Sequence, residues 1–175
     1  MEPSLVDPVL ADHLRVAGVE WCLIGAAALA THGYARDTDD VDLLVLDAGV
    51  LADAFWGAHP VRIRIGDFDD PLRGSVVWLS APQIDVVVGT GFAAREALAT
   101  ALVNDRLGFR VATEKALVLL KLEAGGAQDL YDIVALVQRR PAIDGAKWFE
   151  EVPSHLPRLS SDARDAWTRL QSIFR

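Results

Sequence analysis

The sequence predicts an α/β (α+β) fold in which a mixed β-sheet is flanked by helices and followed by a helical C-terminal part. Strand-length apolar runs alternate with helical segments in the first two thirds of the chain, whereas the last third carries almost only helical signals. The 175 residues, 51% of them hydrophobic, are enough to bury a core without disulfides. We expect residues 1–112 to form the α/β core and residues 113–175 to pack on the same domain as helices.

Helix and strand signals alternate in the first part of the chain. Asp7 can cap a helix that begins at Pro8, and Gly18 can end that helix. Gly25 turns the chain from a buried strand into a short Ala-rich helix, and Gly33 can end it. The predicted elements after the first helix are a strand at 19–24, a helix at 26–32, a polar loop at 34–39, a strand at 40–46 and a helix at 47–58.

The second part begins with further strands and ends with helices. Three apolar or alternating runs favour strands, and the stretch rich in Asp, Pro and Gly at 66–74 favours a loop. Thr113 can cap a helix that ends at Gly125, and Pro141 can close the following one. The predicted elements are strands at 61–65, 75–79, 84–88 and 109–112 and helices at 93–104, 113–123, 129–139 and 160–174.

Charge is distributed unevenly along the chain. The formal net charge is −8, and residues 1–61 carry ten acidic residues against two basic ones. The sequence has no basic stripe of the kind that binds nucleic acid tightly, although five arginines could form a local basic rim. Acids that cluster near one loop fit a metal site instead. The arginines of this rim are Arg62, Arg64, Arg73, Arg106 and Arg110.

Two further observations limit the location of the protein. The longest apolar run, residues 21–30, is too short to span a bilayer, and the N-terminal residues do not look like a signal peptide. We therefore expect a cytoplasmic protein without a membrane partner. The single cysteine, Cys22, lies within a predicted strand and is expected to be a buried, inert thiol.

Asp40 and Asp42 are the first candidates for chemistry. Side chains two residues apart in a strand point to the same face, so these carboxylates project together. A divalent cation such as Mg²⁺, which prefers oxygen ligands, would relieve their repulsion. The alternative is a solvated strand end with two surface acids. Asp85 could add a third ligand, because an acid within an apolar strand is costly unless it is paired or binds metal, or it could lie at an exposed strand end.

Gly25 is the candidate for binding phosphate. It lies between an apolar strand and the start of a helix, where free backbone N–H groups and the positive end of the helix dipole converge. Glycine also allows a ligand to approach the backbone closely. An ordinary turn is the alternative, but Gly25 precedes the paired carboxylates by only about fifteen residues.

The stretch from Gly25 to Asp42 resembles the signature of the nucleotidyltransferase superfamily. The shared pattern is Gly-Ala-x-Ala…His-Gly-x-x-Arg-x-Thr-x-Asp-Val-Asp, and it is most similar to the bacterial AbiEii-like branch, which includes abortive-infection toxins. The later stretch from Lys121 to Ile133 also resembles that family. Two departures are Ala26, which replaces a second glycine or serine, and Gly126 with Gln128, which stand where the family often has basic residues.

This resemblance implies a nucleotidyltransferase-like fold and a role for each matched residue. It implies Mg²⁺ or Mn²⁺ as cofactor, with Asp40, Asp42 and Asp85 as metal-binding and catalytic residues. The implied nucleotide-binding residues are Gly25, Ala26, Arg36, Thr38 and Lys121.

Several of these residues have simpler interpretations. Arg36 could bind phosphate or pair with Asp37, Asp39 or Asp40. Thr38 could equally be a loop hydroxyl that bonds the backbone, and Lys121 could be a surface lysine. The other candidates with a structural interpretation are His32, expected at a helix end, and Asp129 and Asp132, expected to cap a helix.

The activity that the resemblance implies is transfer of a nucleoside monophosphate from a nucleoside triphosphate to an acceptor hydroxyl, with release of pyrophosphate. The acceptor could be RNA, a protein or a small molecule. One alternative is a weakly active or inactive partner or regulator with this fold, for instance in a toxin–antitoxin pair. Another is a metal-dependent phosphohydrolase, although the four histidines are scattered and do not form a ligand set.

Overall fold

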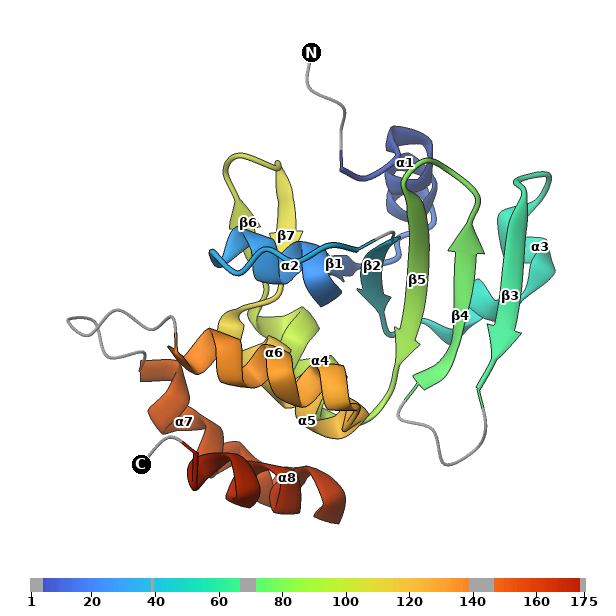
Figure 1. Cartoon of the computed structure of the whole chain (residues 1–175). Helices are drawn as coiled ribbons and strands as arrows, with labels where there is room; N and C mark the ends of the chain where they lie inside the picture. The colour runs from blue at the N-terminus through green and yellow to red at the C-terminus, as the bar shows by residue number, and fades with distance from the viewer. Residues whose placement is uncertain (1–4, 39, 67–71, 139–146, 174–175) are drawn as a thin grey trace.

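The computed structural model describes residues 5–38, 40–66, 72–138 and 147–173, which form a mixed seven-stranded sheet with helices packed around it (Figure 1). The strand order is β3-β4-β5-β2-β1-β7-β6. The predicted mixed sheet flanked by helices is confirmed. The strands are β1 (Trp21–Leu23), β2 (Asp40–Val45), β3 (Val61–Ile65), β4 (Leu72–Trp78), β5 (Gln83–Gly89), β6 (Leu102–Asn104) and β7 (Phe109–Val111).

The helices lie between the strands and after them. Those within the sheet region are α1 (Pro8–Val16), α2 (Gly25–Thr31), the 3-10 helix η1 (Ala48–Leu51), α3 (Asp53–Trp56) and α4 (Gly91–Thr100). From residue 114 on, the regular elements of the described residues are all helices, and they gather below the sheet in Figure 1. They are α5 (Glu114–Ala124), α6 (Ala127–Gln138), α7 (Lys147–His155), the 3-10 helix η2 (Leu156–Arg158) and α8 (Ser161–Gln171).

Strand pairing brings β2 and β5 side by side in the centre of the sheet. These two strands are parallel, as are β1 and β7, whereas β1 pairs antiparallel with β2 and β4 pairs antiparallel with β5. A parallel pair has its strand beginnings at the same edge. Acids near the beginning of β2 and β5 are therefore close in space although they are far apart in the sequence.

The two faces of the sheet are covered differently. On the face of Trp78, the ring of Trp56 in α3 packs beside that tryptophan and stacks with His13 of α1. On the opposite face, Cys22 of β1 donates a weak hydrogen bond to the Ala97 carbonyl oxygen of α4. α1 and α3 thus cover one face, while α4 covers the β1–β2 part of the other.

The predicted helix caps are present. The Asp7 side chain accepts a hydrogen bond from the backbone N–H of Val9 at the start of α1. Thr113 caps α5 and Ser160 caps α8 in the same way. Gly125 ends α5 with a left-handed backbone (φ +66°), as expected for a C-terminal glycine.

Several predicted boundaries were wrong. The helix expected at 47–58 is divided into η1 and the short α3, which Ala52, with its extended backbone, separates. The helix expected at 93–104 starts at Gly91 and ends at Thr100, because Leu102–Asn104 pair with β7 as the edge strand β6. Pairing with a partner strand outweighs local helix propensity here. Strand β4 extends into the predicted loop and begins at Leu72.

The helical end of the chain also differs from the prediction. Helix α7 was not expected, and Pro153 lies inside it. Helix α6 begins at Ala127, two residues before the predicted start, so its acids lie further inside the helix. The predicted closing proline, Pro141, and the end of the helix expected at 129–139 lie outside the described residues, whereas the helix expected at 160–174 ends earlier, at Gln171.

Cys22 is fully buried, as expected, and burial raises the pKa of its thiol to about 12. The core around it joins the sheet to the helices of both parts of the chain, with residues such as Leu44, Leu117 and Trp167. Among the described residues, no helix is both long enough and apolar enough to cross a membrane.

Candidate metal and nucleotide site

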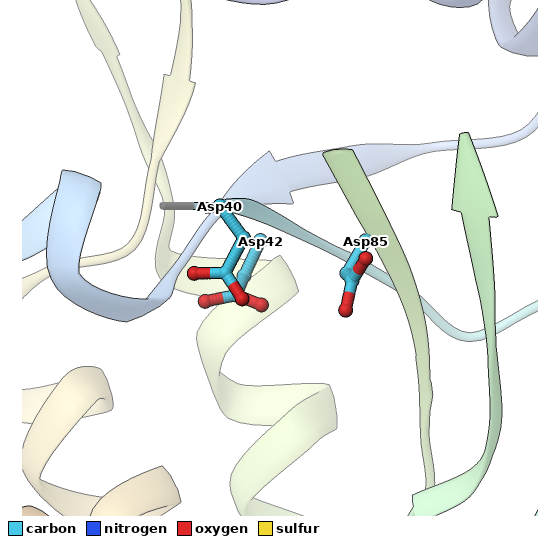
Figure 2. Close-up of side chains that lie close together, drawn as sticks. All are labelled: Asp40, Asp42 and Asp85. Carbon is cyan, nitrogen blue, oxygen red and sulfur yellow. The ribbon is translucent and has the colours of Figure 1, made fainter. Parts of the chain in front are cut away.

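Three carboxylates meet at the edge of the sheet where β2 and β5 begin. Asp40 and Asp42 lie on β2, and Asp85 on β5 is the register partner of Asp42. One carboxylate oxygen from each residue lies within 4.8 Å of those from the other two. Figure 2 shows all three side chains pointing to the same side of the two strands. The structure thus brings together the three acids that the sequence suggested as metal ligands.

The donor set and its spacing fit a divalent cation. All three donors are carboxylate oxygens, which Mg²⁺ and Mn²⁺ prefer. Opposite ligands of a Mg²⁺ ion lie roughly 4 Å apart, so the oxygen atoms are close to the spacing that such an ion needs. Asp40, Asp42 and Asp85 are all partly buried, which keeps their repulsion from being fully screened by water.

The pKa values of two of these acids reflect that repulsion. The pKa of Asp42 is raised to about 6, mainly by burial and also by the charges of Asp40 and Asp85, whereas the charges of Lys121 and Arg36 oppose the shift. Burial also raises the pKa of Asp85, and the charge of Asp40 adds to this shift. A bound cation would favour the ionised forms and remove this cost.

Neutral donors fix the orientation of two of the carboxylates. The Thr38 hydroxyl donates to Oδ1 of Asp40 at 2.7 Å and also lies 3.2 Å from the backbone oxygen of Asp40. The Gln83 amide donates to Oδ1 of Asp85 at 3.0 Å and lowers the pKa of that acid. Sequence reasoning missed Gln83, although its position two residues before Asp85 on one strand places it on the same face.

Gly25 lies directly beside Asp42. Its φ is +65°, and the N–H of Ile24 donates to the backbone oxygen of Asp42 at 3.0 Å. A Cβ atom at position 25 would lie 2.0 Å from Oδ2 of Asp42, so a side chain here would displace the carboxylate. The next residue, Ala26, is buried and belongs to the first turn of α2. A role of Gly25 or Ala26 in binding phosphate stays a prediction.

A cleft of about 960 Å³ opens beside Asp42, between the sheet and the C-terminal helices. Its polar part includes Gly25, Arg36, Lys121 and Asp129. The remaining wall combines apolar side chains with two further acids. The apolar residues are Ile24, Leu72, Val87, Phe92, Leu117 and Leu120, and the acids are Glu123 and Asp162.

Lys121 and Arg36 have other surroundings than their simpler interpretations predict. Lys121 is buried, with 7% of its surface exposed, so the interpretation as a surface lysine is wrong. Its Nζ lies 3.0 Å from Oδ1 of Asp129 and 2.7 Å from Oδ2 of Asp132. Arg36 forms its ion pair with Asp132 (Nε to Oδ1, 3.3 Å), and it contacts Asp37 only through the backbone oxygen. Of the other two acids considered as its partners, Asp40 is not paired with it and Asp39 lies outside the described residues.

Three expectations about neighbouring residues can now be compared with the structure. Asp132 does not cap a helix, because it lies fully buried inside α6. Asp129 is in the first turn of α6 but its carboxylate binds Lys121. His32 is the C-terminal cap residue of α2 and contacts the Ala112 carbonyl oxygen at 2.9 Å, as expected for a structural histidine.

The suggested basic rim is not a single surface. Arg62 and Arg64 lie on β3 at one edge of the sheet, whereas Arg110 lies on β7 beside the opposite edge and pairs with Glu20. The expected rim was wrong because β4, β5, β2 and β1 lie between the strand that carries Arg62 and Arg64 and the strand that carries Arg110. The N–H of Arg106 is bonded to Asn104 in the turn that joins β6 and β7.

Comparison with known proteins gives structural neighbours that are nucleotidyltransferases. No family model matches the chain, and no curated protein matches it in sequence. The antibiotic-resistance factor ANT(2'')-Ia is similar in its solution structure, with 15% identity over 94% of this chain and 89% of that chain and a TM-score of 0.44. Its crystal structure with adenylyl-2''-tobramycin gives 15% identity, 95% coverage of each chain and the same TM-score.

A third solved structure is an antigenic nucleotidyltransferase-like protein from Paracoccidioides brasiliensis. It is 16% identical, covers 89% of each chain and has a TM-score of 0.44. At such identities the likeness concerns the fold and not the activity. The narrower resemblance to the AbiEii-like branch stays a prediction from the sequence.

Proposed function

We propose that the chain is a metal-dependent nucleotidyltransferase that moves a nucleoside monophosphate from a nucleoside triphosphate to an acceptor hydroxyl. The observation that carries the proposal is the convergence of Asp40, Asp42 and Asp85 within 4.8 Å at the edge of a cleft that also holds two cationic side chains. Acids that bind metal beside cations that bind phosphate are the combination that phosphoryl-group chemistry requires.

The three carboxylates would hold Mg²⁺ or Mn²⁺. When bound, the metal would neutralise charge on the phosphates and make the acceptor hydroxyl more acidic. Thr38 and Gln83 support this role, because their hydrogen bonds fix Asp40 and Asp85 before any ligand arrives.

The triphosphate would lie between the carboxylates and the opposite wall of the cleft. Lys121 and Arg36 would contact its phosphate oxygens, and the backbone at Gly25 and Ala26 would approach them without an intervening side chain at residue 25. The apolar wall formed by side chains such as Val87 and Leu120 suits the base and sugar.

In the reaction, the acceptor oxygen attacks the α-phosphorus, the bond from that phosphorus to the β-phosphate bridging oxygen breaks, and pyrophosphate leaves with its electrons. Asp85 would serve either as a metal ligand or as the base that accepts the hydroxyl proton. Most of the rate enhancement would come from positioning and charge stabilisation.

Our proposal places this reaction in the cytoplasm, with an acceptor that is RNA, a protein or a small molecule. The experiment that tests it incubates the protein with Mg²⁺ and each α-³²P-labelled nucleoside triphosphate. Total RNA, cell protein and a small-molecule extract are added in separate reactions. Label in an acceptor, with an equal yield of pyrophosphate, would support the transferase.

Asp42→Asn is the inactivating variant for this assay, and Asp105→Asn is its matched control. Asp105 is an exposed acid in the β6–β7 turn, far from the cleft along the sheet. We expect label transfer to be lost only in Asp42→Asn. Triphosphate binding without transfer would indicate the inactive partner or regulator instead. Phosphate release without a labelled acceptor would indicate a phosphohydrolase.

A further inference from the structure

Asp132 is the centre of a buried polar cluster beside the cleft. It is the only acidic residue with 0% exposure among those that the structure describes. The Nζ of Lys121 lies 2.7 Å from its Oδ2, and the Nε of Arg36 lies 3.3 Å from its Oδ1. The Gln128 amide donates to Oδ1 at 3.0 Å, and a hydrogen bond to Asp132 contributes to the raised pKa of Tyr34.

This cluster joins segments that are far apart in the sequence. Tyr34 and Arg36 belong to the loop before β2, Lys121 belongs to α5, and Asp132 belongs to α6. A second acid, Asp129, binds the same ammonium group at 3.0 Å. The two cations and two acids are balanced in charge, so the ionised cluster as a whole is neutral.

Both cations nevertheless lie within electrostatic reach of the metal site. The charges of Lys121 and Arg36 act against the raised pKa of Asp42, and all three residues line the same cleft. Within the described part of the chain, neither cation forms an ion pair with Asp40, Asp42 or Asp85. Both are paired on the α6 side of the cleft instead.

Burial of such an acid is seldom explained by stability alone. Desolvation of a buried ion pair costs about as much as the attraction returns, and apolar replacements are often as stable. Without Asp132, the ammonium of Lys121 would keep only Asp129 as a partner, and its freed donor would be attracted to the three carboxylates, where an ion pair with Asp42 would compete with a metal ion for the same oxygen atoms.

We propose that Asp132 is a positioning residue that holds Lys121 and Arg36 away from the three carboxylates, so that the carboxylates remain available to metal and the cations to phosphate. This inference rests on the proposed nucleotidyltransferase function. An ammonium group has three donors, and Asp129 and Asp132 occupy two of them, which leaves one for a phosphate oxygen.

The test is a double-mutant cycle with Asp132→Asn, Lys121→Met and the double variant, read out as Mn²⁺ affinity in the absence of nucleotide. Free Mn²⁺ is counted by its electron paramagnetic resonance signal. We expect Asp132→Asn to weaken Mn²⁺ binding about tenfold when Lys121 is present and clearly less when it is methionine, because only Arg36 then loses its partner. Asp162→Asn, which removes an exposed acid from the same cleft, is the control for net charge and is expected to show no coupling to Lys121.

Two results would overturn the inference. One is that Asp132→Asn lowers Mn²⁺ affinity equally in wild type and in Lys121→Met. Asp132 would then act only as a remote negative charge or by stabilising the fold. The other concerns Asp132→Glu, which keeps the charge but moves the carboxylate and serves where Asp132→Asn fails to fold. We expect Mn²⁺ affinity close to wild type and triphosphate affinity reduced several-fold, and unchanged triphosphate affinity would contradict the positioning role.

Failure of the proposed function would be recognised separately. Wild-type protein that binds Mn²⁺ but transfers no label would overturn the transferase assignment, while the coupling between Asp132 and Lys121 would still be measured by Mn²⁺ binding. Wild-type protein that binds no Mn²⁺ would overturn both.

Discussion

Gly25 and Asp42 are in such close contact that no side chain fits between them. A Cβ atom at residue 25 would lie 2.0 Å from Oδ2 and 2.9 Å from Cγ of Asp42. The glycine also has a left-handed backbone, with φ at +65°. The sequence suggested this glycine for binding phosphate, and the structure adds a reason that concerns the metal site: the carboxylate of Asp42 occupies the space that a side chain would need.

The first prediction is that Gly25→Ala displaces the carboxylate of Asp42. The new methyl group must move Oδ2, and the left-handed backbone costs about 1–2 kcal/mol for any residue with a Cβ. We expect Mn²⁺ affinity to fall at least about tenfold, together with a lower free energy of unfolding. Equilibrium binding of Mn²⁺ and urea unfolding would measure the two effects.

Gly18→Ala is the matched control for the backbone cost. Gly18 also has a left-handed backbone, at +71°, but no atom lies within 4 Å of the position of a new Cβ. Gly18→Ala should lower the free energy of unfolding by about as much as the backbone cost in Gly25→Ala, while it keeps wild-type Mn²⁺ affinity. Equal Mn²⁺ affinity in both variants would show that Asp42 does not depend on the space beside Gly25.

The paired acids could be predicted from the sequence because strand geometry is local. Alternation along a strand places Asp40 and Asp42 on one face whatever surrounds them. Predicting that Asp85 joins them required one further inference, that Asp85 lies on a central strand beside β2. The apolar residues around Asp85 indicated such a strand. The parallel register of Asp42 with Asp85 then completes the cluster.

The positions of the two cations of the cleft, Arg36 and Lys121, could not be predicted in the same way. Burial of Lys121 and Asp132 depends on contact between α5, α6 and the loop that carries Arg36, and no local pattern reports such contacts. If the helix began at Asp129, both Asp129 and Asp132 would lie in its first turn and could cap it. The observed start at Ala127 places Asp132 in the helix interior. The division into residues 1–112 and 113–175 stays a prediction.

The second prediction concerns the pH dependence of stability without metal. The pKa of Asp42 in the folded protein is raised to about 6, above the value of about 3.9 expected in the unfolded chain. Its contribution to stability is therefore fully present below about pH 4 and is lost as the pH rises through about 6. We expect a loss of at most about 2–3 kcal/mol from this group, measured by urea unfolding in EDTA.

Asp42→Asn isolates this effect from other titrating groups. The variant cannot ionise at residue 42, so its stability relative to wild type should rise as the pH increases from about 4 to about 7. Added Mg²⁺ should reverse the difference near neutral pH by stabilising wild type alone. A stability difference that does not change with pH would mean that Asp42 titrates normally.

The third prediction is that native Cys22 resists thiol reagents. Its side chain has 0% exposure, and burial raises the pKa to about 12, so almost no thiolate is present near neutral pH. Labelling should be slow in buffer and complete in urea. Cys22 is the single cysteine, so the whole signal belongs to it. Rapid stoichiometric labelling of folded protein would contradict the packing of β1 against α4.

The fourth prediction concerns the hydrogen bond that Thr38 donates to Oδ1 of Asp40. Thr38→Val removes this 2.7 Å bond and leaves the shape of the side chain almost unchanged. Side chains that hydrogen-bond to metal ligands and orient them often contribute about tenfold or more to metal affinity, so we expect Mn²⁺ binding to weaken by about tenfold. The loss should appear in the titration of the protein alone, before nucleotide is added.

Thr168→Val is the matched control for this loss. The Thr168 hydroxyl donates to the Arg164 carbonyl oxygen within α8, so this variant makes the same chemical change away from the carboxylates. It should bind Mn²⁺ as wild type does. If Thr38→Val also binds Mn²⁺ as wild type does, Asp40 either needs no support from Thr38 or is not a ligand. Asp40→Asn separates these cases because it removes that carboxylate directly: weaker Mn²⁺ binding would make Asp40 a ligand that needs no support, and unchanged binding would assign the site to Asp42 and Asp85.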